Sequence, residues 1–137
     1  MAEPKELARR LVACPNFRWM PGMRSRPDPS DPDSLDLRIA WSHGRSQTWV
    51  TEDGDVDEGD LGAINRLPDL SDPATLGCLL ALVREAWGVP ELNPYWSDVR
   101  CEWVLWHVDD AEDAPRITAG SETEALVAAL FAAPAPA

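Results

Sequence analysis

The sequence contains no long apolar run and few basic residues. These two shortages argue against a membrane-spanning protein and against a nucleic-acid-binding protein. No apolar stretch approaches the roughly 20 residues that a membrane-spanning helix needs. The chain carries 12 lysines and arginines against 24 aspartates and glutamates, so its formal net charge is -12. Because so acidic a chain repels nucleic acid unless its cations are clustered, we expect neither direct binding of nucleic acid nor association with a membrane.

Motifs of the common catalytic and cofactor sites are missing as well. The sequence has no phosphate-binding loop, no dinucleotide-binding glycine motif, no nucleophile elbow and no HExxH zinc motif. Its two histidines are isolated, with His43 in a predicted turn and His107 in an apolar strand. Cys101 lies six residues before His107, roughly 20 Å along a strand, so the two cannot share a metal ion without a sharp bend. We therefore predict no metal site, no cofactor and no enzymatic activity.

Cysteine is also scarce. Cys14, Cys78 and Cys101 are odd in number and widely spaced, so the sequence contains no disulfide framework. The first residues, MAEPKELARRL, are charged and amphipathic, unlike a secretory signal peptide. Both features favour a cytoplasmic protein with reduced thiols.

The chain does contain the material for one hydrophobic core. It has 137 residues, of which 45% are hydrophobic, and a domain of this size needs neither disulfides nor metal to fold. We expect one α+β domain over residues 1–132 and a disordered tail over residues 133–137. Seven residues are tryptophan. Each of them either fills the core, which is the more common role, or is exposed and anchors an interface.

Capping signals and helical spacing predict three helices, over residues 4–13, 72–88 and 121–131. In the second, Asp72 is a natural N-cap, Pro73 suits the first turn and Gly88 ends the helix. In the third, Ser121 and Glu124 form a capping box. We expect the second helix to be the most buried element. The apolar positions expected on the three buried faces are Leu7, Leu11, Cys14, Leu76, Cys78, Leu79, Leu80, Leu82, Val83, Trp87, Leu126, Val127, Leu130 and Phe131.

Alternating or continuous apolar residues predict four strands, over residues 35–41, 47–51, 102–108 and 116–119. In the first, Leu35, Leu37, Ile39 and Trp41 share one face, so all four are expected to be buried. A turn at residues 42–45 makes the first two strands a hairpin. The segments expected to lack regular structure are 26–34, 51–60, 61–70, 91–100 and 109–115. The resulting fold class is α+β, with a four-stranded, mainly antiparallel sheet and the order α-ββ-α-ββ-α.

The most distinctive segment is TEDGDVDEGD at residues 51–60, where six of ten residues are acidic. Mutual repulsion and the glycines predict an exposed loop. Asp53, Asp55 and Asp57 match the first ligand positions of a calcium-binding EF-hand loop, but Glu58 and Ile64 replace its required glycine and glutamate. The segment is therefore either plain solvated charge or an acidic docking surface for a partner. The candidate partner-binding residues are Glu52, Asp53, Asp55, Asp57, Glu58 and Asp60.

A second mixed segment runs from Phe17 to Arg26 and alternates aromatic with basic side chains. Single-stranded nucleic-acid platforms use this mixture. It also occurs where arginine stems cover tryptophan faces at a corner of a fold. The negative charge of the whole chain favours the structural interpretation.

Three segments resemble a known group: LPDLSDPATLGCLLALVREAWG at 67–88, FRWMPGMR at 17–24 and TEALVAAL at 123–130. They are similar to small uncharacterised phage and prophage proteins of the phage α-β-α (ABA) sandwich group. The resemblance implies a phage accessory protein with helices on a small sheet. It provides no catalytic residues.

Together with the charge, the resemblance favours a non-enzymatic protein of the host cytoplasm that binds a host protein or ribonucleoprotein complex with a basic surface. The best candidate is an inhibitor of host anti-phage defence, of the anti-CRISPR or anti-restriction type. The alternatives are a small metal-dependent enzyme that uses the acidic loop and a phage structural or assembly factor.

Overall fold

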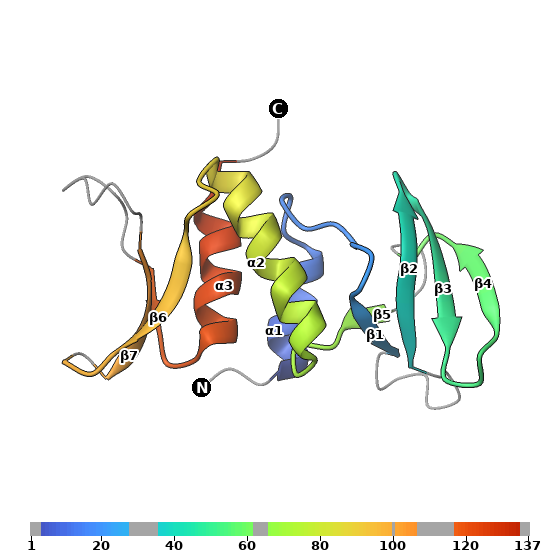
Figure 1. Ribbon diagram of the computed structural model, residues 1–137, viewed down its shortest axis with the longest axis horizontal. Helices are drawn as coiled ribbons and strands as arrows, with labels where there is room; N and C mark the ends of the chain where they lie inside the picture. Colours follow the sequence, from blue (N-terminus) through green and yellow to red (C-terminus); the bar gives the residue numbers. More distant parts are fainter. Residues whose placement is uncertain (1–3, 28–35, 62–65, 100, 107–116, 135–137) are drawn as a thin grey trace.

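The computed structural model describes residues 4–27, 36–61, 66–99, 101–106 and 117–134 (Figure 1). Within these ranges the chain is α+β, with three helices and eight strands. Several expectations concern residues outside them: residues 28–34 of the proline–aspartate loop, Leu35, Ile64, His107, the acidic turn at 109–115 and the last residues, 135–137.

Five strands form the first sheet, in the order β4-β3-β2-β1-β5 with antiparallel neighbours throughout. Their bounds are β1 Arg24–Pro27, β2 Leu37–His43, β3 Ser46–Thr51, β4 Val56–Gly59 and β5 Arg66–Pro68. Strands β1 to β4 form a meander, and β5 returns to pair with the free side of β1. The predicted β2–β3 hairpin is confirmed. Its turn contains Gly44, whose φ of 59° lies in the left-handed region that glycine tolerates.

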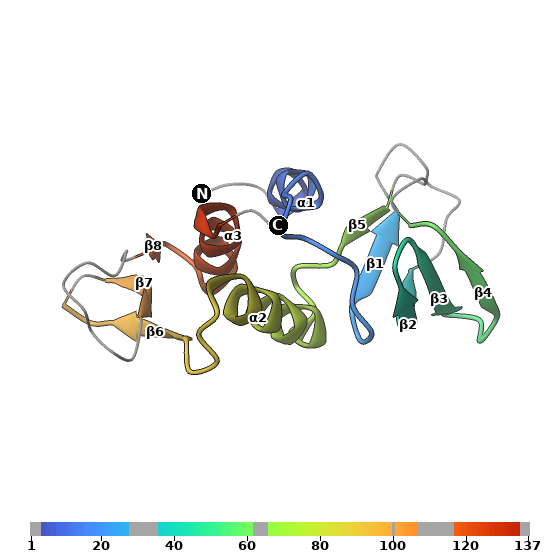
Figure 2. The ribbon, with the colours of Figure 1, turned by 90° about the horizontal axis from the view of Figure 1, so that it is seen from above.

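Three strands form the second sheet, in the order β6-β7-β8 and again antiparallel. Their bounds are β6 Asn93–Ser97, β7 Glu102–Trp106 and β8 Ile117–Ala119. The helices are α1 Pro4–Val12, α2 Pro73–Trp87 and α3 Glu122–Ala132, and they lie between the two sheets (Figure 2). Helix α3 contacts all three strands of the second sheet, α2 packs on α3, and α1 contacts β5.

The prediction of a single four-stranded sheet in the order α-ββ-α-ββ-α is therefore wrong. Strands β1, β4, β5 and β6 were expected to be loop or irregular chain. They have only three to five residues each, and prolines or charges replace the alternating apolar residues that identify a strand. Main-chain pairing with a neighbouring strand holds such segments in place, so their own sequence carries little signal.

The termini of α2 and α3 form as the capping signals predict. The Asp72 carboxylate accepts a hydrogen bond from the Thr75 N–H at 3.0 Å, and Gly88 ends α2 with a φ of 68°. At α3, the Ser121 hydroxyl accepts a hydrogen bond from the Glu124 N–H at 3.1 Å. Both helices therefore start where the sequence places them.

The burial of the helix faces follows the prediction only in part. Leu79 and Val83 of α2 are inaccessible, but Leu76 and Leu80 are only half-buried. Leu82 is buried as expected, and the core-facing side of α2 also includes Thr75, a polar residue that the apolar pattern does not single out. On α3, Phe131 is 41% exposed. The Arg10 guanidinium lies 5.6 Å from the centre of its ring, which accounts for this partial cover.

Strand β2 departs from the predicted alternation at one residue. Ile39 pairs with Trp49 while Trp41 pairs with Thr48, so β2 contains one extra residue, Ala40, between the two pairs. Such a β-bulge re-aims the side chains that follow it. Leu37 and Ile39 are buried as expected, but Trp41 is 64% exposed, which corrects the prediction that it shares their face.

Candidate functional site

The acidic segment forms the turn and outer strand of the β3–β4 hairpin. Thr51 donates its N–H to the Asp55 carbonyl and accepts the Gly54 N–H on its own carbonyl, both at 2.9 Å. Its hydroxyl also accepts a hydrogen bond from the Asp55 N–H at 3.2 Å. Gly54 has a φ of 87°, a conformation that suits glycine. The segment is exposed as predicted, but it is an ordered hairpin rather than a loop.

The structure brings the six candidate acids onto this hairpin, and most of their charge is uncompensated. Glu52 lies 3.5 Å from the Arg24 guanidinium. Of the other five candidate acids, four have no cation at ion-pair distance in the described part of the chain, namely Asp53, Asp55, Asp57 and Glu58. All four residues are exposed. We call these four the hairpin acids.

A second group of charges lies where the first sheet meets the start of α2, and it is balanced. Arg24 contacts Asp36 at 2.8 Å and Asp69 at 3.7 Å. Arg26 contacts the same two carboxylates, each at 3.5 Å. The side chains of Asp36 and Asp69 are 19% and 4% exposed, so these carboxylates need their cationic partners. This group holds β1, the start of β2 and the end of β5 together.

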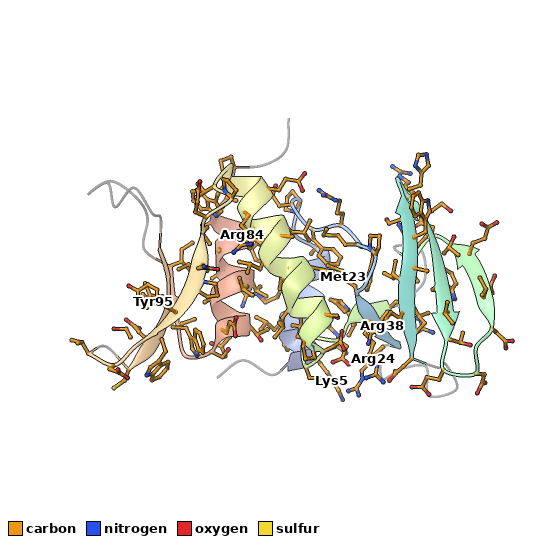
Figure 3. The ribbon with its side chains drawn as sticks, viewed as in Figure 1. Lys5, Met23, Arg24, Arg38, Arg84 and Tyr95 are labelled. Atoms are coloured by element: carbon orange, nitrogen blue, oxygen red, sulfur yellow. The ribbon has the colours of Figure 1, made fainter. Side chains whose placement is uncertain are left out.

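Arg38 of β2 makes a third charged contact, directly with the N-cap of α2. Its guanidinium donates to both carboxylate oxygens of Asp72, at 3.0 and 3.1 Å, and to the Gly22 carbonyl at 2.8 Å. The hydrogen bonds from Arg38 lower the pKa of Asp72 to about 2, despite an opposing effect of burial. Arg24 and Arg38 both lie at the junction of the sheet with α2 (Figure 3).

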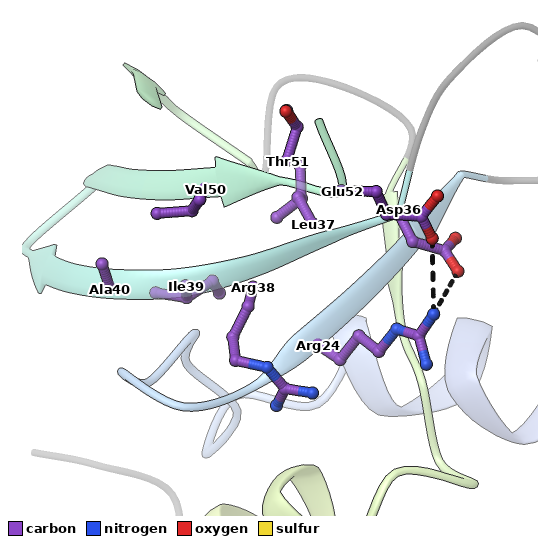
Figure 4. Close-up of a pocket in the computed structure, with 9 residues that line it drawn as sticks. All are labelled: Arg24, Asp36, Leu37, Arg38, Ile39, Ala40, Val50, Thr51 and Glu52. Atoms are coloured by element: carbon purple, nitrogen blue, oxygen red, sulfur yellow. Dashed lines mark hydrogen bonds and ion pairs between the residues drawn. The ribbon is translucent and has the colours of Figure 1, made fainter. Parts of the chain in front are cut away.

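The outer face of β2 and β3 is hollowed next to these arginines (Figure 4). The depression has a volume of about 480 Å³. Ala40 and Val50 are the exposed apolar residues of its lining, and Asp36 and Glu52 lie near Arg24 at one end. The arginines there are already paired with carboxylates, so the depression offers little free positive charge.

The geometry gives no support to the metal-enzyme alternative. No group of three histidine, cysteine or acidic side chains in the described ranges is arranged to hold a metal ion. Asp53, Asp55 and Asp57 lie on a hairpin, whereas an EF-hand places its ligands in a loop between two helices. His43 is exposed at the end of β2, next to the β2–β3 turn and at the opposite end of β3 from the acidic turn of the β3–β4 hairpin.

The aromatic and basic segment at 17–26 has a structural role. Trp19 is buried, and Phe17 packs against it edge-on with ring centres 5.3 Å apart. Arg18 forms two hydrogen bonds to Glu85 of α2, and these lower the pKa of that carboxyl. Arg24 and Arg26 belong to the balanced group. These contacts agree with the corner interpretation, since the three arginines are each paired with a carboxylate.

The tryptophans divide between the two roles that the sequence allowed. Trp19 and Trp49 are buried. Trp41 and Trp96 are 64% and 46% exposed, and Trp96 also packs edge-on against Trp103. Trp41 is thus the most exposed tryptophan among those whose side chains are described.

The three cysteines are free thiols. Cys14 is buried, and Cys78 donates a hydrogen bond to the Pro21 carbonyl at 3.4 Å. Burial raises the pKa of the Cys78 thiol. Cys101 is exposed, at a turn with a φ of 53°.

Comparison of the chain with protein-family models, with curated proteins and with solved structures finds no match. Among the described helices, none is long and apolar enough to cross a membrane.

Sequence reasoning found the acidic segment but missed the surface around it. The row of Arg24, Arg38 and Val50 is formed by residues of three strands, and β1 was not predicted. The exposure of Trp41 depends on the bulge at Ala40. No residue type in β2 marks this bulge, so the sequence held no signal for the exposure of Trp41.

Proposed function

We propose that this protein acts by binding, and that the β3–β4 hairpin docks on a basic surface of a macromolecular partner. The observation that supports this most is the uncompensated charge of the hairpin acids. The balanced group at the junction contains cations for its carboxylates, whereas the hairpin acids have none in the described chain. Charges that repel one another and have no ion-pair partner in the described chain are explained if a binding partner supplies the cations.

The order of the hairpin strengthens the proposal. The three hydrogen bonds at Thr51 fix the turn, so the carboxylates of Asp53 and Asp55 are held on a rigid support. A preorganised acidic surface loses less conformational freedom on binding than a mobile loop would. It also attracts a cationic partner before contact, which raises the association rate at low salt.

The partner class follows from charge and from the resemblance of residues 67–88 to phage α-β-α sandwich proteins. We place the protein in the host cytoplasm and its partner among host proteins or ribonucleoprotein complexes. The best candidate is a defence complex of the CRISPR or restriction type, whose basic channel normally holds nucleic acid. The hairpin would compete for that channel by presenting carboxylates in place of phosphates.

The test compares two variants that change net charge equally. The first replaces the hairpin acids by Asn and Gln. The second makes the same kind of change at four acids of the opposite end of the molecule, none of which forms an ion pair in the described chain. These control positions are Glu91, Asp98, Glu102 and Glu122.

Each protein is immobilised, exposed to a bacterial lysate and analysed by mass spectrometry. We expect a partner that the wild type and the control retain and the hairpin variant loses. The association rate with the purified partner should then fall about tenfold or more in the hairpin variant at low salt, with a flatter salt dependence. Equal retention and equal association rates for all three proteins would contradict the proposed function.

A further inference from the structure

The outer face of β2, β3 and β4 carries two rows of side chains that the strand register defines. In the first row, Arg38 pairs with Val50, and Val50 with Val56. In the second row, Trp41 pairs with Thr48, and Thr48 with Glu58. Because paired residues of neighbouring strands share a face, Trp41, Val50 and Val56 lie on one surface.

This surface carries large exposed apolar side chains among its polar ones, whereas a solvated sheet face is normally polar. Trp41, Val50 and Val56 are 64%, 36% and 68% exposed. Ala40 is exposed beside them and lines the depression in Figure 4. No described element of the chain packs on Trp41 or Val56, so folding gains little from either side chain.

The β-bulge at Ala40 is the structural cause of the exposure of Trp41. If β2 kept regular pairing through Ala40, the alternation that buries Leu37 and Ile39 would also turn Trp41 toward the core. Instead, the pairing of β2 with β3 is irregular at Ala40, and Trp41, the largest side chain of β2, faces solvent. Bulges re-aim side chains next to functional sites, and tryptophan is enriched among the residues that dominate binding energy.

The charges around this surface indicate the charge of the partner that can bind there. Glu58 lies in the Trp41 row, and Glu52 lies at the end of the depression beside Val50 and Thr51. Arg38 and Arg24 are neutralised by Asp72 and Asp36, so the free charge at the border is negative. A second copy of this chain, with a net charge of -12, is therefore disfavoured, as is nucleic acid.

We propose that this face is the docking surface for an extended, basic and amphipathic segment of a protein partner, with Trp41 as its apolar anchor. The partner's apolar side chains cover Trp41, Val50 and Val56, and its lysines or arginines lie beside Glu52 and Glu58. Docking occurs on the face of the sheet rather than along the edge of β4, because the Asp57 carboxylate accepts the Glu58 N–H at 2.8 Å and blunts that edge. The inference rests on the proposed function and adds the anchor and the form of the partner.

The experiment uses a defined probe, a blocked eight-residue peptide that alternates lysine and leucine. Its binding to the full chain is followed by two-dimensional NMR at the Trp41 indole N–H and at the Val50 and Val56 amides. A peptide with glutamate in place of lysine is the charge control. We expect saturable shifts of all three signals with the basic peptide and none with the acidic one.

Two variants separate the contribution of the Trp41 anchor to binding from the contribution of the hairpin acids. Trp41→Ala should weaken binding of the basic peptide about tenfold and leave the slope of its salt dependence unchanged. The variant lacking the hairpin acids should also weaken binding, but with a reduced slope. Trp96→Ala, which removes an exposed tryptophan of the other sheet, should bind like the wild type. Val56→Ser repeats the test on the same face if Trp41→Ala is poorly folded.

The outcomes distinguish the two proposals. If Trp41→Ala and Val56→Ser bind as tightly as the wild type, or if the Trp41 signal does not move, the docking surface is overturned. If Trp41→Ala weakens binding but the hairpin variant keeps the wild-type salt slope, the anchor stands and the electrostatic function fails. Equal binding of the acidic peptide, or signals at Trp41 that shift with protein concentration alone, would also overturn the choice of occupant.

Discussion

At the scale of single residues, Asp72 connects more of the fold than any other carboxylate at the junction. It caps α2 through the N–H and hydroxyl of Thr75, each at 3.0 Å, and it accepts two hydrogen bonds from Arg38 of β2. Arg38 in turn binds the Gly22 carbonyl. One acid thus joins the first sheet, the segment before β1 and the start of the longest helix.

The pH dependence of stability tests this role. The pKa of Asp72 is about 2 in the folded chain, below the ordinary value of 3.8. A lowered folded pKa means that the stabilisation is fully present above the unfolded value and is lost as the pH falls through the folded one. We expect Asp72→Asn, which keeps an N-cap, to lower the free energy of unfolding by about 1–2 kcal/mol at neutral pH.

The difference between wild type and Asp72→Asn should stay constant down to about pH 5 and disappear toward pH 2. Urea unfolding at a series of pH values measures it. Asp98→Asn, at an exposed acid outside any described ion pair, serves as the control and should change little. A difference for Asp72→Asn that does not change with pH would contradict the ion-pair role.

Trp41 shows what the sequence cannot supply at this scale. The alternation of Leu37, Ile39 and Trp41 is the ordinary sign of a half-buried strand, and it holds for the first two. The bulge at Ala40 then reverses the direction of the third. A bulge depends on the fit of two strands to each other, and no residue type in β2 announces it.

At the scale of elements, the helices could be predicted and half of the strands could not. Asp72, Gly88 and Ser121 occupy cap positions that act through local hydrogen bonds, so their meaning is contained in a few adjacent residues. Strands β4 and β6 are edge strands paired to β3 and β7, and they lack an apolar face of their own. These two strands form because they pair with β3 and β7, and the local sequence of β4 or β6 does not show that pairing.

The packing of α2 yields a prediction with a built-in control. Leu79 is inaccessible, whereas its neighbour Leu80 is half-buried at the margin of the core. Leu79→Ala should cost about 2–5 kcal/mol of unfolding free energy because it leaves a cavity. Leu80→Ala should cost clearly less, with the same change in helix propensity. Denaturant unfolding measures both, and equal losses would show that the buried face of α2 is misassigned.

At the scale of the whole molecule, charge is distributed unevenly between balanced and unbalanced regions. The junction around Arg24 contains its own cations, and the hairpin acids do not. The acidic segment could be identified from the sequence because its six acids lie within ten consecutive residues. Which acids are neutralised depends on Arg24 approaching Glu52 and Asp36 across the sheet, and that requires the strand order.

This imbalance predicts that salt stabilises the protein. Repulsion among the hairpin acids is relieved when the chain unfolds, so it lowers the melting temperature at low ionic strength. Screening becomes strong above about 0.1 M salt, where the Debye length is about 10 Å. The wild type should therefore melt a few degrees higher in about 0.3 M sodium chloride than in about 0.01 M, measured by circular dichroism.

The two charge variants decide whether the cause is local. Removing the hairpin acids should raise the melting temperature at low salt by about 2–4 °C and reduce its salt dependence, since repulsion of about 0.5–1 kcal/mol is lost. The control variant at Glu91, Asp98, Glu102 and Glu122 changes the net charge equally but removes no crowded group, so its gain should be smaller. Equal gains would mean that the total charge of -12, and not crowding on the hairpin, limits stability. A lower melting temperature in the hairpin variant would show that these carboxylates support the fold. In that case the charge of these residues would be explained by the fold itself and would not support a partner.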